Sequence, residues 1–235
     1  MVAVPERPKY GHRIWPPKEG YDLVASVYDQ WYWRPFWLQN EIPHIERLAQ
    51  TVEGARLALD LGCGTGTYCA VLEHICDVVG VDPSAEMLRA ARKHISAKTH
   101  LVCGSASAIP LGNAEVDISV AARSLCHEQD LAGAFRELGR VTRRSGVCIV
   151  SEVHPQHDYP RTRIPLGAED VHIETFKRTP QEIIDTATSE GAWEVEHQSE
   201  VRWRDLNWEP ADPRFSRIDR TSHRAIFFVI GLRRR

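Results

Sequence analysis

Short apolar runs alternate with helical patterns along the middle of this chain, from about residue 56 to residue 153. Five apolar runs predict buried strands, at 56–60, 77–82, 100–103, 116–121 and 147–153. Between them, apolar residues recur at helical spacing, first in 67–76 and then in a segment that Ser84 caps. A third helical segment starts near Leu131 and is expected to end near Ser145-Gly146. Strands and helices that alternate in this way predict a parallel sheet covered by helices on both faces.

The two ends of the chain show different patterns. Residues 1–53 contain a run crowded with aromatic side chains at 28–37, and we expect an N-terminal cap there, followed by the main domain at 54–235. Residues 154–179 and 204–222 lack periodicity and are predicted to be long loops, which in compact domains are usually functional. The remaining pattern predicts three elements, a helix at 180–190 and strands at 193–203 and 224–232.

Composition and charge narrow the class of protein. The 235 residues carry 29 basic and 32 acidic side chains, a net charge of −3, so a nucleic-acid partner is not expected. The longest apolar run, 225–232, is far shorter than the roughly 20 residues that span a bilayer. The first residues mix proline and charge without an apolar leader, so we expect no membrane association and a cytoplasmic location.

Cysteine and histidine spacing gives little support to a metal site. The six cysteines include no Cys-x-x-Cys pair and are expected to be buried, reduced thiols. His154 and His157 invite a metal interpretation, but a proline stands between them in a predicted loop. We therefore expect no metal, and we interpret these histidines as facing a substrate or solvent.

A glycine-rich turn is the strongest chemical signal. The sequence Asp-Leu-Gly-Cys-Gly-Thr-Gly at 60–66 follows a predicted strand and precedes a predicted helix. Glycines at such a turn allow the backbone to approach a ligand closely. Asp82 stands twenty positions after Gly62, at the end of the next strand, where a carboxylate can accept hydrogen bonds from both hydroxyls of a ribose. A nucleoside-containing cofactor is therefore expected at the carboxyl ends of these strands.

The spacing and charge of the turn bear on which cofactor binds. Dinucleotide-binding turns read G-x-G-x-x-G, whereas this turn reads G-x-G-x-G. Asp60, beside the turn, would repel a pyrophosphate but suits a ligand that carries an ammonium or sulfonium group. A dehydrogenase is therefore disfavoured.

At this point the chain resembles the class I S-adenosylmethionine-dependent methyltransferases, particularly the small-molecule "type 11" branch. The resemblance runs from about Tyr21 to His154 and rests on six segments: 21–29 (YDxxAxxYD), 59–66 (LDLGCGTG), 81–88, 104–110, 116–127 and 137–146. The chain departs from the family pattern at two positions. Ser105 replaces an aspartate that usually contacts the adenine, and Cys126 replaces the first residue of a histidine pair.

The resemblance implies a fold and a set of cofactor contacts. The expected fold is α/β, a Rossmann-like doubly wound sheet of seven strands, mostly parallel with one antiparallel strand near the C-terminus, plus an N-terminal helical cap. The expected cofactor is S-adenosyl-L-methionine, with contacts from Tyr28, Asp60, Gly62, Cys63, Gly64, Thr65, Gly66, Asp82, Pro83, Met87, Ser105, Ala106 and Ala121.

Candidate residues for the chemistry follow the later strands. His127 comes just after the fourth strand and is a candidate general base, and Glu152, at the end of the fifth strand, is a candidate to orient it. The alternative is that His127 only forms a pocket wall. Four further residues are expected to face the substrate: Trp31, His154, His157 and Tyr159. Most other aromatic residues of 28–37 are interpreted as packing against the sheet.

These expectations lead to one function and several alternatives. The chain is predicted to transfer a methyl group from S-adenosylmethionine to the nitrogen, oxygen or carbon atom of a small molecule, as a monomer or homodimer. A macromolecular acceptor is one alternative. A second is a protein that binds S-adenosylmethionine without transferring a methyl group, because a fold does not fix a function.

Overall fold

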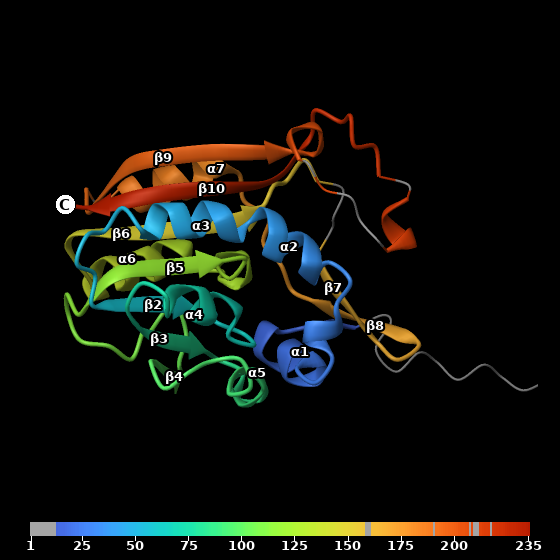
Figure 1. The fold of residues 1–235 in the computed structure, drawn as a ribbon, viewed down its shortest axis with the longest axis horizontal. Coiled ribbons are helices and arrows are strands. Elements are labelled where there is room, and N and C mark those ends of the chain that lie inside the picture. Colours follow the sequence, from blue (N-terminus) through green and yellow to red (C-terminus); the bar gives the residue numbers. More distant parts are fainter. Residues whose placement is uncertain (1–12, 158–160, 190, 207, 209–211, 217) are drawn as a thin grey trace, which may run out of the picture.

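A seven-stranded sheet forms the centre of the molecule, in the strand order β4-β3-β2-β5-β6-β10-β9 (Figure 1). This computed structural model describes residues 13–235 except 158–160, 190, 207, 209–211 and 217. The strands are β2 (Leu57–Leu61), β3 (Asp77–Asp82), β4 (Thr99–Cys103), β5 (Val116–Ala122), β6 (Thr142–Val153), β9 (Trp193–Arg202) and β10 (Ala225–Arg234). β10 is antiparallel to both of its neighbours, β6 and β9, whereas the strands from β4 to β6 pair in parallel. The predicted fold, with its one antiparallel strand near the C-terminus, is confirmed.

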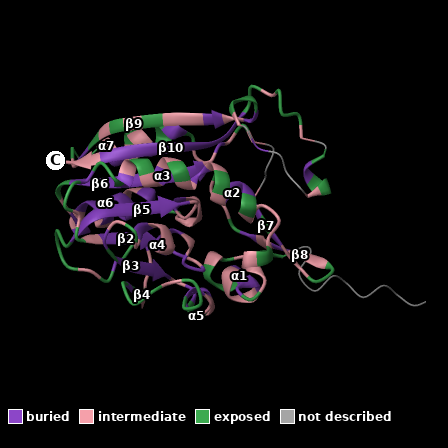
Figure 2. Ribbon diagram, viewed as in Figure 1, coloured by how far each residue is buried: buried purple, intermediate pink, exposed green. Residues whose placement is uncertain are grey.

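Helices cover both faces of this sheet, and Figure 2 shows that its central strands are almost entirely buried. On one face Ile45 and Leu72 pack into the core, and on the other face Phe135 and Ile183 do so. These side chains come from α3 (Ile42–Ala49), α4 (Thr67–Leu72), α6 (Leu131–Val141) and α7 (Pro180–Thr188). α5 (Ala85–Ala91) begins at Ser84, whose side chain accepts a hydrogen bond from the Met87 N–H, as the sequence predicts. No helix in the described ranges is long and apolar enough to cross a membrane.

The N-terminal segment packs its aromatic side chains onto the sheet and onto the segment after β9. It consists of α1 (Pro17–Val24), η1 (Tyr28–Gln30) and α2 (Arg34–Asn40), and it packs near η3 (Trp203–Asp205) and η4 (Pro213–Phe215). Phe36 is fully buried, with ring centroids of Trp37 and Trp208 each 4.9 Å from its own. The Trp33 ring lies 4.9 Å from that of Phe215, edge to face. For Phe36 the interpretation as core packing is confirmed.

The segment 154–179 is not the long loop that the sequence predicts. It contains a hairpin of β7 (Thr162–Leu166) and β8 (Glu169–Ile173), and β1 (Ile14–Trp15) pairs in parallel with β8 to make a second sheet. Pro165 counts against a strand in the sequence, so β7 was not predicted. β7 is an edge strand, however, and an edge strand tolerates a residue without an N–H donor. The buried residues Ile164 and Ile173 of the hairpin pack with Val24 of α1.

The junction between α6 and β6 also differs from the expectation. α6 ends at Val141 and β6 begins at Thr142, whereas the sequence placed the end of the helix near Ser145-Gly146. The pairing of β6 with β5 shifts register opposite Asp117, and Ser145 there adopts a φ of +62°. The glycine signal therefore marks an irregularity inside the strand rather than the end of the helix.

Asp117 fastens this irregular region to the start of β2. Its Oδ2 accepts hydrogen bonds from the backbone N–H groups of Arg56 (2.6 Å) and Leu57 (3.0 Å), and Arg143 forms an ion pair with the same carboxylate. Burial opposes ionisation of Asp117, but these donors outweigh it and lower the pKa of the carboxyl below its ordinary 3.8.

We expect Asp117→Asn to lower the free energy of unfolding by about 1–3 kcal/mol near neutral pH, because the charged acceptor of two backbone donors is lost. A group with a lowered folded-state pKa stabilises the fold above its unfolded pKa and loses that effect as the pH falls through its folded pKa. The difference from wild type should therefore be constant above about pH 5 and shrink as the pH falls below 3.8. Urea denaturation across this range measures it. Asp77→Asn, at an exposed position on β3, is the control, and an equal loss in the control would contradict the explanation.

Candidate active site

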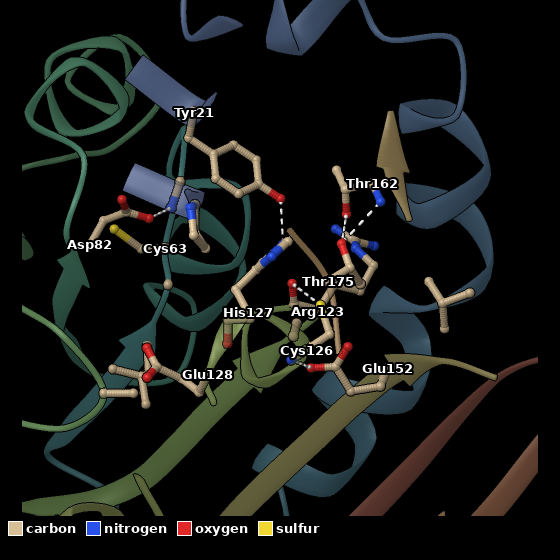
Figure 3. A pocket seen from close by; sticks show the side chains of 18 of the residues that line it. Tyr21, Cys63, Asp82, Arg123, Cys126, His127, Glu128, Glu152, Thr162 and Thr175 are labelled. Carbon is tan, nitrogen blue, oxygen red and sulfur yellow. Dashed lines mark hydrogen bonds between the residues drawn. The ribbon is translucent and has the colours of Figure 1, made fainter. Parts of the chain in front are cut away.

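One pocket lies across the carboxyl ends of β2, β3, β5 and β6. The strand ends contribute Gly62, Asp82, Ser124 and Glu152 to its lining. The N-terminal segment and the residues after β8 contribute the remaining walls, which include Tyr21, Tyr28, Trp31, Thr175 and Phe176. In Figure 3, Asp82 and Cys63 lie on one side and Glu152 and Cys126 on the other, with Tyr21 and His127 between them.

The glycine-rich turn is folded tightly against its neighbours. The N–H groups of Gly62 and Cys63 both donate to the Val81 carbonyl oxygen, at 2.7 and 3.1 Å. Gly62 has a φ of +75°, and a Cβ added there would lie 2.4 Å from the Cβ of Ser124, which follows β5. Gly64 has a φ of +53° with nothing near its missing Cβ. The first glycine is therefore required by packing and the second by backbone conformation.

Asp82 joins the turn to the start of α5. Its Oδ2 accepts a hydrogen bond from the Gly64 N–H and its Oδ1 one from the Ser84 N–H, each at 2.8 Å. Because a carboxylate has about four acceptor sites, two remain for a ligand. Burial raises the pKa of Asp82 to about 6. A buried carboxylate that lines the pocket and keeps free acceptor sites fits the two hydroxyls of a ribose.

Several other residues predicted to bind the cofactor also line this pocket. They are Tyr28, Cys63, Thr65, Pro83, Met87 and Ala106. Of the residues predicted to face the substrate, Trp31 and His157 line the pocket, and so do the candidate catalytic residues His127 and Glu152. Tyr159 lies outside the described residues.

The structure places five of the predicted site residues outside the pocket lining: Asp60, Gly66, Ser105, Ala121 and His154. Asp60 is 1% exposed and accepts a hydrogen bond from the Cys69 thiol of α4 (3.2 Å), and burial raises its pKa to about 7. The His154 side chain lies beside Phe228 and Glu200 instead. Side chains on a strand alternate between faces, so Ala122 lines the pocket rather than Ala121.

The His127 side chain is held by hydrogen bonds to two segments that lie far from it in the sequence. Its Nδ1 lies 2.6 Å from the Glu174 carbonyl oxygen and its Nε2 lies 2.8 Å from the Tyr21 hydroxyl. A carbonyl oxygen only accepts, so Nδ1 carries the proton and Tyr21 donates to Nε2. Burial lowers the pKa of His127 to about 4, so the imidazole is neutral near pH 7.

Glu152 does not orient His127 as expected. Its side chain is 3% exposed, and its Oε1 accepts a hydrogen bond from the Cys126 N–H at 2.9 Å. The groups that orient the histidine are Tyr21 and the backbone of Glu174. Burial raises the pKa of Glu152 to about 7.

An ion pair that sequence reasoning missed connects the N-terminal segment to the pocket. Glu41, fully buried between α2 and α3, binds the guanidinium of Arg123, which lines the pocket with a φ of +55°. Glu41 also accepts hydrogen bonds from the hydroxyls of Tyr68 and Ser151. The only sequence signal for Arg123 is its place directly after a buried strand, where ligand contacts gather in such sheets.

No cluster of metal-ligating side chains occurs within the part of the chain that the structure describes.

Comparison with known proteins finds a family match in the centre of the chain. Residues 59–150 match the family described as "Methyltransferase domain". A curated relative, "O-methyltransferase cnsE" of Penicillium expansum, is 30% identical over 154 residues, which cover 59% of this chain and 55% of the relative. The chain spans about half the length of the curated relatives it matches first.

Solved structures match over most of the chain. An S-adenosylmethionine-dependent methyltransferase from Mesorhizobium loti matches with a TM-score of 0.62 and 21% identity, over 84% of this chain and all of the other. The "[4+2]-Cyclase SpnF" matches with a TM-score of 0.68 and 17% identity, over 92% and 94% of the two chains. The fold is thus that of these proteins, and residues 59–150 match the methyltransferase-domain family, in agreement with the resemblance seen in the sequence. The expected cofactor, S-adenosylmethionine, agrees with this domain.

Gly62→Ala is expected to lower the free energy of unfolding by about 2–4 kcal/mol, through backbone strain together with the clash at Ser124. Gly64→Ala, which meets no neighbour, should cost only about 1–2 kcal/mol of strain. Adding Ser124→Gly to Gly62→Ala should recover part of the loss, because it removes the contacted Cβ. Chemical denaturation of the four proteins tests this ranking, and equal losses for the two alanine variants would refute the packing argument.

His127 is expected to remain neutral, with its proton on Nδ1, down to about pH 4. Imidazole ¹⁵N shifts of labelled protein report the tautomer and the protonation state directly. In Tyr21→Phe the Nε2 resonance should move toward the position of an imidazole nitrogen without a hydrogen bond. A proton on Nε2, or a charged ring at pH 7, would contradict the geometry around His127.

Proposed function

We propose that this chain, whose residues 59–150 match the methyltransferase-domain family, transfers a methyl group from S-adenosylmethionine to a small-molecule acceptor. The observation that carries the proposal is the continuous pocket that joins the Asp82 side of the glycine turn to a second, largely aromatic region. One region suits a nucleoside and the other suits a compact, apolar acceptor beside it.

The residues on the Asp82 side would hold the cofactor. Asp82 would accept hydrogen bonds from the ribose hydroxyls, and Met87 and Ala106 would offer apolar surface to the adenine. Gly62 and Gly64 would let the backbone approach the rest of the cofactor closely. When bound, S-adenosylmethionine supplies an electrophilic methyl group on a sulfonium.

The residues of the second region would orient the acceptor and exclude water. Trp31, Trp33 and Phe176 form apolar walls. The segment that contains Phe176 is fastened to the end of β5, because the Phe176 N–H donates to the Cys126 carbonyl oxygen and Arg178 binds the carbonyl oxygens of Leu125 and Glu128. Fixed walls of this kind favour catalysis by orientation, which can contribute roughly 7–11 kcal/mol to lowering a barrier.

The small-molecule acceptor is favoured by these walls. α1, η1 and the segment after β8 all contribute lining residues, so the pocket is bordered on several sides rather than laid open as a shallow surface. The name of the Penicillium relative, an O-methyltransferase, is consistent with an acceptor oxygen. We retain the expected cytoplasmic location and the expected monomer or homodimer as part of the proposal.

The test combines binding with transfer. We expect S-adenosylmethionine to bind by calorimetry, and a labelled methyl group to pass from it into the small-molecule fraction of an extract of the source cells. Asp82→Ala should weaken cofactor binding by about 10- to 100-fold, because hydrogen bonds to a charged acceptor are lost. Asp77→Ala, at the exposed start of the same strand, is the matched control.

The outcomes separate the alternatives. Label found only in protein or nucleic acid would overturn the small-molecule acceptor. Binding without transfer would favour a protein that does not methylate. The cyclase among the matching structures is an example of this fold with a different named activity. Absence of binding would overturn the proposal as a whole.

A further inference from the structure

Glu152 has a carboxylate oxygen without a hydrogen-bond partner in the part of the chain that the structure describes. Its Oε1 accepts the hydrogen bond from the Cys126 N–H, but its Oε2 is buried and has no hydrogen-bond partner among the described residues. Buried polar atoms are nearly always paired, and an unpaired one in a native structure needs an explanation. Because Glu152 lines the pocket, a ligand that donates a hydrogen bond is the simplest explanation.

Three neighbouring ionisable side chains in the pocket lining already have partners. His127 uses both ring nitrogens, one with Tyr21 and one with the Glu174 carbonyl oxygen. The positive charge of Arg123 is balanced by Glu41. Arg178 binds backbone carbonyl oxygens of the η2 (Leu125–His127) region. In contrast to these three side chains, Glu152 keeps an acceptor atom without a partner among the described residues.

We propose that Glu152 is the general base of the reaction, and that the methyl acceptor is a nucleophile X–H (hydroxyl, amine N–H, thiol or activated C–H) whose proton passes to Glu152 Oε2. This inference rests on the proposed methyl transfer. It excludes as acceptors a carboxylate, which has no proton to give and would be repelled by Glu152, and a tertiary amine.

The step balances in atoms and charge. The acceptor atom X forms a bond to the methyl carbon, the carbon–sulfur bond breaks, and its electron pair stays on sulfur. The X–H proton moves to Glu152 Oε2. The positive sulfonium and the negative carboxylate both become neutral, and loss of two opposite charges is favoured where burial makes charged groups costly.

The surroundings of Glu152 suit this role near neutral pH. Burial raises its pKa to about 7, and the negative charge of Glu41 acts in the same direction. The Cys126 N–H and thiol and the positive charge of Arg123 act against these effects. A base whose pKa is close to the working pH combines a useful ionised fraction with proton affinity. His127, with a pKa lowered to about 4, is a much weaker base.

The first part of the test asks what kind of bond the enzyme makes. The labelled product formed from S-adenosylmethionine and cell extract is treated with mild alkali, which cleaves methyl esters but not ethers, thioethers, N-methyl amines or C-methyl groups. We expect the label to survive on a product that is not a quaternary ammonium. An alkali-labile methyl ester or a quaternary ammonium product would overturn the assignment of the acceptor.

The second part tests the residue with Glu152→Gln, which has nearly the same volume and keeps an acceptor for the Cys126 N–H. Calorimetric affinity for S-adenosylmethionine should stay near that of wild type, whereas kcat/KM should fall by about 10²- to 10⁴-fold. Wild-type kcat/KM should rise with pH, reach half of its maximum near pH 7 and level off above that, and Glu152→Asp should restore part of the activity together with that rise. Glu200→Gln, whose carboxylate pairs with Arg202 away from the pocket lining, is the control.

A cofactor-free readout checks the ionisation itself. The infrared difference spectrum between about pH 5 and pH 9 should contain a protonated-carboxyl band that is missing in Glu152→Gln. Transfer by Glu152→Gln at nearly the wild-type rate, or the absence of that band, would overturn the role of Glu152. A complete lack of labelled product from protein that binds S-adenosylmethionine would instead overturn the proposed function on which the inference rests.

Discussion

The carboxylate of Asp82 holds together the two backbone segments on which the site depends. One oxygen accepts a hydrogen bond from the Gly64 N–H in the glycine turn, and the other accepts one from the Ser84 N–H at the start of α5. The turn itself is fixed by a second pair of hydrogen bonds to the Val81 carbonyl oxygen, one residue before Asp82. The ends of β2 and β3 therefore form one rigid unit. Asp82, which we propose to bind the ribose, also fixes the loop that would surround it.

The N-terminal segment completes the pocket because buried polar contacts fix it to this unit. Asp22 of α1 accepts a hydrogen bond from the Ser84 hydroxyl at 2.6 Å, so the residue that caps α5 also anchors α1. Glu41 binds Arg123 at the end of β5 and Ser151 within β6. Removing one partner of such a buried pair leaves an uncompensated charge, which is strongly unfavourable. These contacts fix the N-terminal segment near both of its ends, and they help to hold Tyr21 beside His127.

Much of the fold and part of the site could be predicted from the sequence, for identifiable reasons. Strands β2, β3 and β5 are buried on both faces, so they show as nearly continuous apolar runs, and the glycine turn and Asp82 follow two of them directly. The β7–β8 hairpin gave no such signal because its strands are short and Pro165 interrupts one of them. The contacts of Glu41 with Arg123 and of Tyr21 with His127 join residues 82 and 106 positions apart, and no local pattern encodes such pairs.

Glu152 shows most clearly why the position of a residue in the sequence does not by itself reveal its chemical role. From the sequence Glu152 was an acidic residue at a strand end that was expected to orient His127, and His127 was the candidate base because it directly follows the fourth strand. The structure reverses this order through burial, which penalises the charged form of each group. For the histidine the charged form is the protonated one, so its pKa falls to about 4, whereas for the glutamate it is the ionised one, so its pKa rises to about 7. The same apolar surroundings therefore weaken one base and strengthen the other. Together with the Glu152 Oε2 atom, which has no hydrogen-bond partner among the described residues, this is why we assign Glu152 rather than His127 to take the acceptor's proton.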